Sequence, residues 1–390
     1  MKRLVRDEKF KIPDYIFMVL SVLNVGVFVF SSDIFGNIGL FSLFARLLII
    51  VNLGVLLLGF LKQSSSHAVK QYVTIFFMLI FGVLSYLINR PISLFEFIVL
   101  FAGYLAVPVY AVSVPKLKFN RNMIVWFRII SVVYALYFIY RGFFTPTYRE
   151  GSGALLLGYI NSNTTGAYMF LVSLFVLLSF NNAAKRIWRI FSYLIVAILL
   201  YLIIQTQCRT AFILTGLCLV YAVLPKIYRP GKLFVTVSVL SSYLFYYLYT
   251  YLYQISWNTD LTILDRTFYS GRQITFLEIG LKYSLFGDFK ELFGGLNVSL
   301  GVLNTLGIIG FVLFLIFYTT FLFSPIMQNY KGKRREKRNL PLICFCAIMF
   351  HGCVETVLFT GGSVFAGVIG CIIAVIMCNN QDVQQKQIKR

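Results

Sequence analysis

Four arginines in this chain lie in polar or turn-rich segments between long apolar runs. They are Arg149, Arg209, Arg266 and Arg272. A guanidinium group presents a rigid fork of N–H donors that matches a phosphate group, and it stays charged at every physiological pH. The chemistry that these residues support is therefore the binding of a phosphate or diphosphate.

Arg272 lies where a helix is expected to begin. Ser270 and Gln273 have the spacing of a capping box, and apolar residues follow at helical spacing as far as Leu285, with Gly287 as a stop signal. The first turn of a helix favours an anion, and a guanidinium at the same place strengthens a phosphate site. The alternative reading of Arg272 is a solvated surface charge.

Arg209 follows a very short polar segment, Gln205-Thr-Gln-Cys-Arg209, between two apolar runs. Placing a guanidinium near hydrocarbon costs several kcal/mol unless it is paired or reaches water, so such a residue indicates function by default. The alternative is that Arg209 extends to the lipid headgroups and has no other role.

Several further polar side chains are candidates for the same chemistry. His351 and Glu355 are four residues apart, which puts them on one face of a helix. A carboxylate is needed to assist an acceptor hydroxyl group. The candidate carboxylates are Glu150, Asp265 and Glu355, and the candidate substrate-binding residues are Arg149, Asn161, Asn163, Asn297, His351 and Glu96. For Glu96, a buried ion pair that fixes helix packing is an equal alternative.

The elements that must position these residues are membrane helices. The 390 residues are 59% hydrophobic with a mean hydropathy of +0.82, which is too apolar for a water-soluble domain. Apolar runs long enough to span a bilayer predict about twelve transmembrane helices in an all-α integral membrane protein. The runs lie near residues 14–31, 39–61, 71–88, 93–112, 124–142, 157–180, 187–205, 210–225, 233–254, 298–323, 340–359 and 362–378.

The basic residues predict how this chain is threaded. Most of the 35 lysines and arginines fall in alternate loops, so the positive-inside rule places both termini in the cytoplasm. Residues 1–390 then form one polytopic membrane domain, and residues 254–297 form a large external loop with a short helix between the ninth and tenth spans. The net charge of +21 is explained by this topology and by attraction to anionic lipid headgroups. It does not indicate nucleic-acid binding.

Other function classes lack their sequence signals. The chain has no nucleotide-binding glycine loop, no zinc-ligand spacing and no disulfide framework, so we expect no metal and no cofactor. The two halves also lack matching Gly- or Pro-broken helices, which weakens the hypothesis of a transporter built from two similar halves.

The order of several short motifs resembles the bacterial O-antigen/capsule polymerase and O-antigen ligase family. The motifs are Asn161-Ser-Asn163-Thr-Thr-Gly166, Gln205-Thr-Gln-Cys-Arg209-Thr-Ala211, Ser270-Gly-Arg272, Leu285-Phe-Gly287, and Asn297 ahead of Leu306-Gly-Ile-Ile-Gly310. The resemblance covers about residues 155–325. It implies a glycosyltransferase of the bacterial cytoplasmic membrane that acts on undecaprenyl-diphosphate-linked glycans. It also implies that Arg209 and Arg272 act in lipid-diphosphate binding or catalysis.

One departure from the family pattern favours a polymerase over a ligase. Ligases commonly have His-Asn ahead of the Leu-Gly-Ile-Ile-Gly stretch, and this chain has Leu296-Asn297. The predicted function is the polymerisation of lipid-linked repeat units at the outer face of the membrane, with a flippase and a chain-length regulator as expected partners. A lipid-linked oligosaccharide flippase and an O-antigen ligase are the alternatives.

Overall fold

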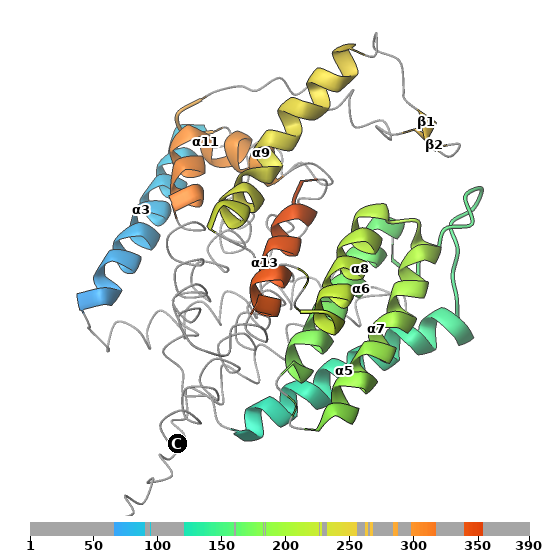
Figure 1. Ribbon diagram of the computed structural model, residues 1–390. Coiled ribbons are helices and arrows are strands. Elements are labelled where there is room, and N and C mark those ends of the chain that lie inside the picture. Colours follow the sequence, from blue (N-terminus) through green and yellow to red (C-terminus); the bar gives the residue numbers. More distant parts are fainter. Residues whose placement is uncertain are drawn as a thin grey trace, which may run out of the picture.

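The computed structural model describes eight helical segments and a short hairpin. The described residues are 66–89, 94, 121–159, 161–181, 183, 185–225, 227, 232–255, 262–263, 266–267, 284–287, 298–316 and 339–353. Helices dominate this part of the chain, as the sequence predicts for a helical membrane protein. Figure 1 shows their arrangement.

Helix α6 (Ser162–Phe180) is the centre of the described bundle. It contacts α5 (Arg121–Phe144), α7 (Arg186–Thr206) and α8 (Arg209–Val223). Its sequence is apolar on every side, and nearly all of its side chains are buried. A helix that is apolar all round is stable only when it is surrounded, so α6 takes the central place and its neighbours cover it.

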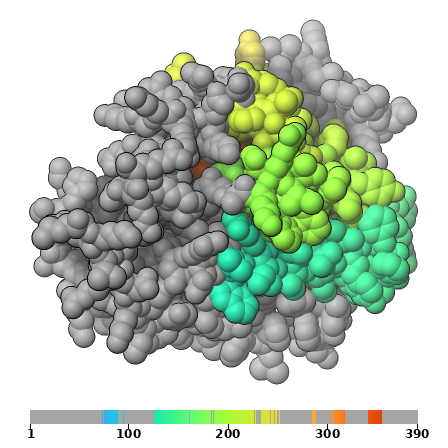
Figure 2. All heavy atoms as spheres, turned by 60° about the horizontal axis from the view of Figure 1, so that its bottom comes forward, coloured from blue at the N-terminus to red at the C-terminus, as the bar shows by residue number. Residues whose placement is uncertain are grey.

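Helices α5 and α7 present apolar side chains outward as well as inward. Together they form much of the coloured surface in Figure 2, α5 in teal and α7 in light green. Trp126 and Leu136 of α5 and Leu194 of α7 are each more than half exposed. An exposed face of this kind is expected where the solvent is lipid hydrocarbon. Among the residues that the structure describes, three helices are long and apolar enough to cross a membrane, namely Val125–Phe144, Ser162–Phe180 and Arg186–Thr206.

A second group of helices joins this bundle through α13 (Asn339–His351). Helix α13 contacts α6, α8 and α9 (Lys232–Ile255), and α9 in turn contacts α11 (Val298–Ile316). Helix α11 also packs on α3 (Ser66–Asn89). After α9, strands β1 (Thr262–Ile263) and β2 (Arg266–Thr267) form a small antiparallel hairpin.

A basic residue of α5 forms a hydrogen bond to the last turn of α6, at the lower end of this helix in Figure 1. Arg128 Nε donates a hydrogen bond of 2.9 Å to the carbonyl of Ser179, and its guanidinium lies 5.6 Å from the ring of Phe180. The last carbonyls of a helix have no partner within it, and the helix dipole favours a cation there. Arg128 therefore acts as a cap for α6.

The described helices agree with eight of the predicted spans in position, although their ends differ by several residues. Two of these apolar helices also make polar contacts: the Ser85 hydroxyl of α3 bonds to the Phe286 carbonyl, and the Ile308 N–H of α11 bonds to the Ser284 carbonyl. The predicted runs at 14–31, 39–61, 93–112 and 362–378 lie outside the described residues. The total of about twelve spans and the cytoplasmic termini stay predictions.

Candidate functional site

The polar segment between α5 and α6 folds into a tight hairpin. The backbone N–H of Arg149 donates to the Ala154 carbonyl at 2.8 Å, and Tyr148 pairs with Leu155 in an antiparallel bridge. Gly151 and Gly153 have φ values of 77° and 62°, which glycine adopts without strain. This segment is therefore a hydrogen-bonded hairpin, with Arg149 and Glu150 exposed at its tip.

The second polar segment joins α7 to α8 through a sharp turn of two residues. Gln207 ends α7 in the left-handed conformation with φ of 62°, and its N–H donates to the Ile204 carbonyl at 2.9 Å. Thr206 is fully buried, donates to the Ile203 carbonyl at 2.7 Å, and accepts from the Cys208 N–H at 3.2 Å. These bonds fix where α8 begins, and Arg209 is its first residue.

The hairpin is bound to this turn by two hydrogen bonds. The Leu155 N–H donates to the Gln205 carbonyl at 2.9 Å, and the Gln207 side-chain amide donates to the Ser152 carbonyl at 2.9 Å. On its other side, the hairpin accepts a bond of 2.7 Å from the Thr165 hydroxyl to the Leu156 carbonyl. The hairpin and the start of α6, which follow each other in sequence, thus form one unit with the distant α7–α8 turn, which we name the hairpin–turn site (residues 147–159, 161–166 and 205–209).

Gly166 allows the start of α6 to approach the α7–α8 turn closely. A Cβ atom at this position would overlap the Cβ of Cys208 and would lie 2.9 Å from the Thr206 Oγ1. Only glycine leaves room for this contact. The Asn161–Gly166 and Gln205–Ala211 motifs therefore meet where the backbone of Gly166 packs against the side chains of Cys208 and Thr206.

The exposed polar groups of the hairpin–turn site are mostly those that the sequence singles out. Arg209, Arg149, Glu150 and Asn161 are exposed, and Asn163 is half-buried. The side chain of Asn161 accepts from the Asn163 N–H at 2.9 Å and so caps α6. This bond gives Asn161 a structural role, because capping satisfies an N–H group that the helix leaves unpaired.

The first turn of helix α8 contains a cation, Arg209, and no acidic residue. Its N-cap residue, Cys208, makes no side-chain capping bond, and Arg209 follows at the first helical position. A positive side chain here is unfavourable for the helix itself, because the helix dipole already makes this end positive. The arrangement suits the binding of an anion.

A second pair of motifs meets at a break in α11. Gly307 has φ of 71° and ψ of −170°, a conformation that is essentially restricted to glycine, and it interrupts the helix. The Ile308 N–H donates to the Ser284 carbonyl at 3.0 Å, and a Cβ at Gly307 would overlap the Leu285 carbonyl. The Leu306–Gly310 stretch is thus built to receive the Leu285–Gly287 segment.

The Leu285–Gly287 segment, which belongs to the predicted external loop, also contacts α3. The Ser85 hydroxyl donates a hydrogen bond to the Phe286 carbonyl, and the rings of Phe81 and Phe286 stack with centroids 6.1 Å apart. Non-helical backbone in a membrane protein persists where neighbours satisfy its polar groups. The broken helix and the loop segment satisfy each other here.

Arg266 lies in strand β2, next to the turn of the small hairpin. In Figure 1 this hairpin, the C-terminal end of α9 and the α7–α8 connection all lie toward the upper end of the helices. Five other candidates lie outside the described residues. They are Arg272, Asp265, Asn297, Glu96 and Glu355. The predicted helix from Ser270 also falls there.

His351 does not belong to the hairpin–turn site, which carries the exposed Arg149 and Arg209. It is fully buried, and its ring stacks on Phe170 with centroids 5.3 Å apart and an angle of 9°. Phe170 is nine residues from Asn161 along α6, which is about 13 Å at a rise of 1.5 Å per residue. The structure thus puts His351 in the interior of the helix bundle, and its assignment to substrate binding stays a prediction.

Residue-by-residue reading of the sequence missed the side chains that assemble the site. Thr165 and Gln207 donate the side-chain bonds that join the hairpin to its neighbours, and Thr206 fixes the turn by its bond to the Ile203 carbonyl. Arg141 supports the hairpin by donating to the Leu157 carbonyl at 3.1 Å. Their common signal is a polar group at the end of an apolar run, where a backbone carbonyl or N–H needs a partner.

No family model, curated protein or solved structure matches this chain.

Proposed function

We propose that the protein polymerises the repeat units of a bacterial surface polysaccharide. A growing glycan is transferred from undecaprenyl diphosphate to a sugar hydroxyl of the next lipid-linked unit. The bond between the anomeric carbon of the donor sugar and the phosphate oxygen breaks, and a bond between that carbon and the acceptor oxygen forms. The hydroxyl proton passes to a carboxylate, and undecaprenyl diphosphate leaves.

The observation that carries this proposal is the convergence of the Asn161–Gly166 and Gln205–Ala211 motifs at one end of the bundle. Their contact through Gly166 positions Arg209 at the exposed start of α8, beside a hairpin that carries Arg149 and Glu150. An anion-binding cation and a candidate base thus come from segments that are about sixty residues apart in sequence. A transfer from a lipid diphosphate requires both kinds of group.

The arginines take the place that a metal ion often fills in phosphate chemistry. Arg209, Arg266 and Arg272 would hold the diphosphate leaving group by bidentate hydrogen bonds and offset the charge that develops on it. Arg149, at the exposed tip of the hairpin, would attract the anionic substrate. The base is one of Glu150, Asp265 and Glu355. Metal dependence is not expected.

The gene-deletion phenotype tests the proposed reaction. Cells that lack the protein should display short glycans of about one repeat unit on the surface or on the lipid carrier, because export and ligation do not depend on polymerisation. Polysaccharide gels and analysis of extracted lipid-linked glycans provide the measurement. Accumulation of lipid-linked units on the cytoplasmic face would instead indicate a flippase and would exclude the polymerase.

The proposed outer location of the site predicts the accessibility of two exposed positions. Ser152 lies at the hairpin, and Lys185 precedes α7 at the opposite end of the bundle. The described native cysteines, Cys208, Cys218, Cys344, Cys346 and Cys353, are buried. In a background without Cys371 and Cys378, a membrane-impermeant maleimide should label Ser152→Cys in intact cells and should leave Lys185→Cys unlabelled.

Permeabilised cells are the control for that experiment, because both engineered cysteines should then react. Labelling of Lys185→Cys but not of Ser152→Cys in intact cells would reverse the orientation. A reaction on the outer face of the membrane would then be excluded.

A further inference from the structure

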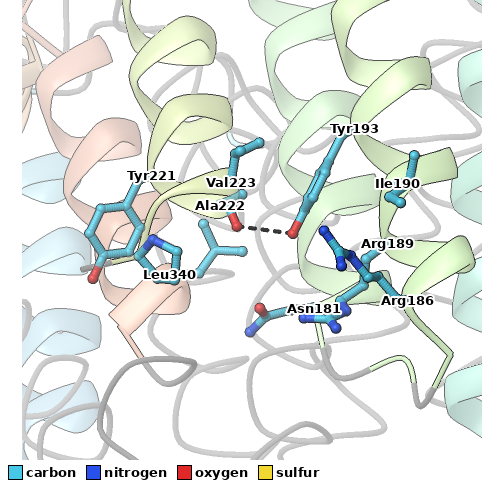
Figure 3. A pocket seen from close by; sticks show the side chains of 10 residues that line it. Asn181, Arg186, Arg189, Ile190, Tyr193, Tyr221, Ala222, Val223 and Leu340 are labelled. Carbon is cyan, nitrogen blue, oxygen red and sulfur yellow. Dashed lines mark hydrogen bonds between the residues drawn. The ribbon is translucent and has the colours of Figure 1, made fainter. Parts of the chain in front are cut away.

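A pocket opens at the end of α6 opposite the hairpin–turn site. It has a volume of about 350 Å³ and lies between the start of α7, the end of α8 and the start of α13. Figure 3 shows the side chains that line it, with two arginines on one side and apolar groups on the other. The residues that line it include Asn181, Arg186, Arg189, Tyr193, Val223 and Leu340.

The polar side of this pocket is strongly cationic. Arg186 and Arg189 project toward Asn181 and Tyr193 in Figure 3. No acidic residue is found among the described residues of its lining. The Tyr193 hydroxyl donates to the Ala222 carbonyl at 2.9 Å, which holds the ring at the edge of the pocket.

Arg189 has hydrogen-bonding capacity that the described part of the protein does not use. Its side chain is half-buried, and its buried Nε has no hydrogen-bond partner among the described residues. A buried donor without a partner costs free energy, and the cost is larger for a charged group. An anion in the pocket would remove this cost.

The length of α6 and the position of Trp188 put the pocket near the depth that is expected for a lipid headgroup. Helix α6 has 19 residues and is therefore about 28 Å long, close to the hydrocarbon thickness of a bilayer. Trp188, which is 51% exposed, lies in the first turn of α7, and tryptophan favours the membrane–water boundary. Exposed Ile187 and Ile190 continue the apolar surface from there.

We propose that this pocket binds the phosphate group of an anionic membrane lipid. The two guanidinium groups would hold the phosphate oxygens, and Val223 and Leu340 would contact the upper part of the lipid chains or the glycerol backbone. A basic pocket between membrane helices at the headgroup level is suited to such a lipid. The apolar wall favours a lipid over a free phosphate ion, which has no apolar part to bury.

This inference is independent of the proposed reaction, because the pocket and the hairpin–turn site lie at opposite ends of α6. A lipid bound in the pocket would hold the basic end of the bundle, where α6, α7 and α8 meet, at the membrane surface. A protein without polymerase activity could still bind the lipid, and the two proposals fail separately.

A binding titration tests the pocket directly. The purified full-length protein in neutral detergent is titrated with phosphatidylglycerol, with phosphatidylcholine of the same acyl chains, and with inorganic phosphate. Native mass spectrometry measures the bound lipid. Phosphatidylglycerol should bind saturably and at least tenfold more tightly than the other two.

Variants assign the binding to the pocket. Arg189→Gln should weaken phosphatidylglycerol binding about tenfold, since a hydrogen bond to a charged group is worth about 1.4 kcal/mol or more. Arg189→Lys should lose less. Lys185→Gln is the matched control, because it removes one exposed charge beside the pocket without changing its lining. It should change the affinity less than about threefold.

Three results would overturn the proposal. Equal binding of phosphatidylglycerol and phosphatidylcholine would exclude a site for anionic lipid, and equal binding of inorganic phosphate would indicate a site for a soluble anion. An effect of Lys185→Gln as large as that of Arg189→Gln would indicate attraction by the whole basic end. If Arg189→Gln lowers the melting temperature of the protein, Arg186→Gln, at an exposed position, takes its place in the comparison.

Discussion

Gly166→Ala should destabilise the protein by about 1–3 kcal/mol and abolish the formation of long polymer. The added Cβ would overlap the Cβ of Cys208, and Thr206 Oγ1 would also be too close. Cys208 and Thr206 belong to the turn that positions Arg209, so the collision displaces the start of α8. Thermal unfolding of the purified protein and polymer length on gels measure the two effects.

Gly216→Ala is the matched control for this substitution. Gly216 lies within α8, and a Cβ there would have no atom within 4 Å. Alanine is a better helix former than glycine by about 0.5–1 kcal/mol, so this variant should be at least as stable as the natural protein. It should also make polymer of full length.

The double variant Gly166→Ala with Cys208→Gly tests the contact itself. Removal of the Cys208 side chain makes room for the new Cβ, and glycine is acceptable at an N-cap position. At least half of the lost stability should return. If the double variant is instead less stable than Gly166→Ala alone, the start of α6 does not contact the α7–α8 turn through Gly166 and Cys208. The hairpin–turn site would then not be assembled as the structure has it.

The sequence predicts the helical fold well because each span is a local pattern. α6 shows this best, since an apolar run of the right length with Asn161 before it and two asparagines after it is sufficient to set its position. Its central place follows from the same pattern, because no side of it is polar. Helix ends are less predictable, as Arg128 illustrates: its bond to the Ser179 carbonyl is a tertiary contact over 51 residues.

The candidate site is predicted from the sequence only in part. Arg209, Asn161 and Arg149 are visible as polar residues in apolar surroundings, but their meeting depends on contacts without a local signal. The bond from Gln207 to Ser152 spans 55 residues, and the Gly166 contact depends on the crossing of α6 with the α7–α8 turn. The break at Gly307 is a similar case, since glycine is common in apolar helices and only the contact with Leu285 shows what it does here.

The hairpin fixes the backbone at Arg149. Its backbone N–H and carbonyl are both hydrogen-bonded within the hairpin, to Ala154 and from Gly153 at 2.8 and 3.0 Å. The side chain is nevertheless exposed, and no hydrogen bond from its guanidinium to a described residue is seen. A fixed but solvated cation attracts an anionic substrate over distance, which depends on charge more than on the shape of the group.

Arg209→Lys should lower polymerase activity about a hundredfold, the scale expected when one donor to a developing charge is lost. Lysine keeps the positive charge at the start of α8 but loses the two parallel N–H donors that match a diphosphate. Arg272→Lys should behave likewise if Arg272 begins a helix in the external loop, as its sequence predicts. Polymer length in the complemented deletion strain measures activity, and the membrane level of each variant is measured in parallel.

Arg149→Lys tests whether Arg149 binds the substrate directly or only attracts it by its charge. It also exchanges one cation for another at an exposed position of the same site, but it should lower activity less than about threefold, because attraction over distance needs only the charge. The contrast between the two lysine variants should persist at high salt, since screening weakens attraction over distance more than a direct bidentate contact. Full-length polymer from both Arg209→Lys and Arg209→Ala, at normal protein levels, would show that Arg209 only reaches toward the headgroups. The diphosphate would then have to be held by residues other than the start of α8.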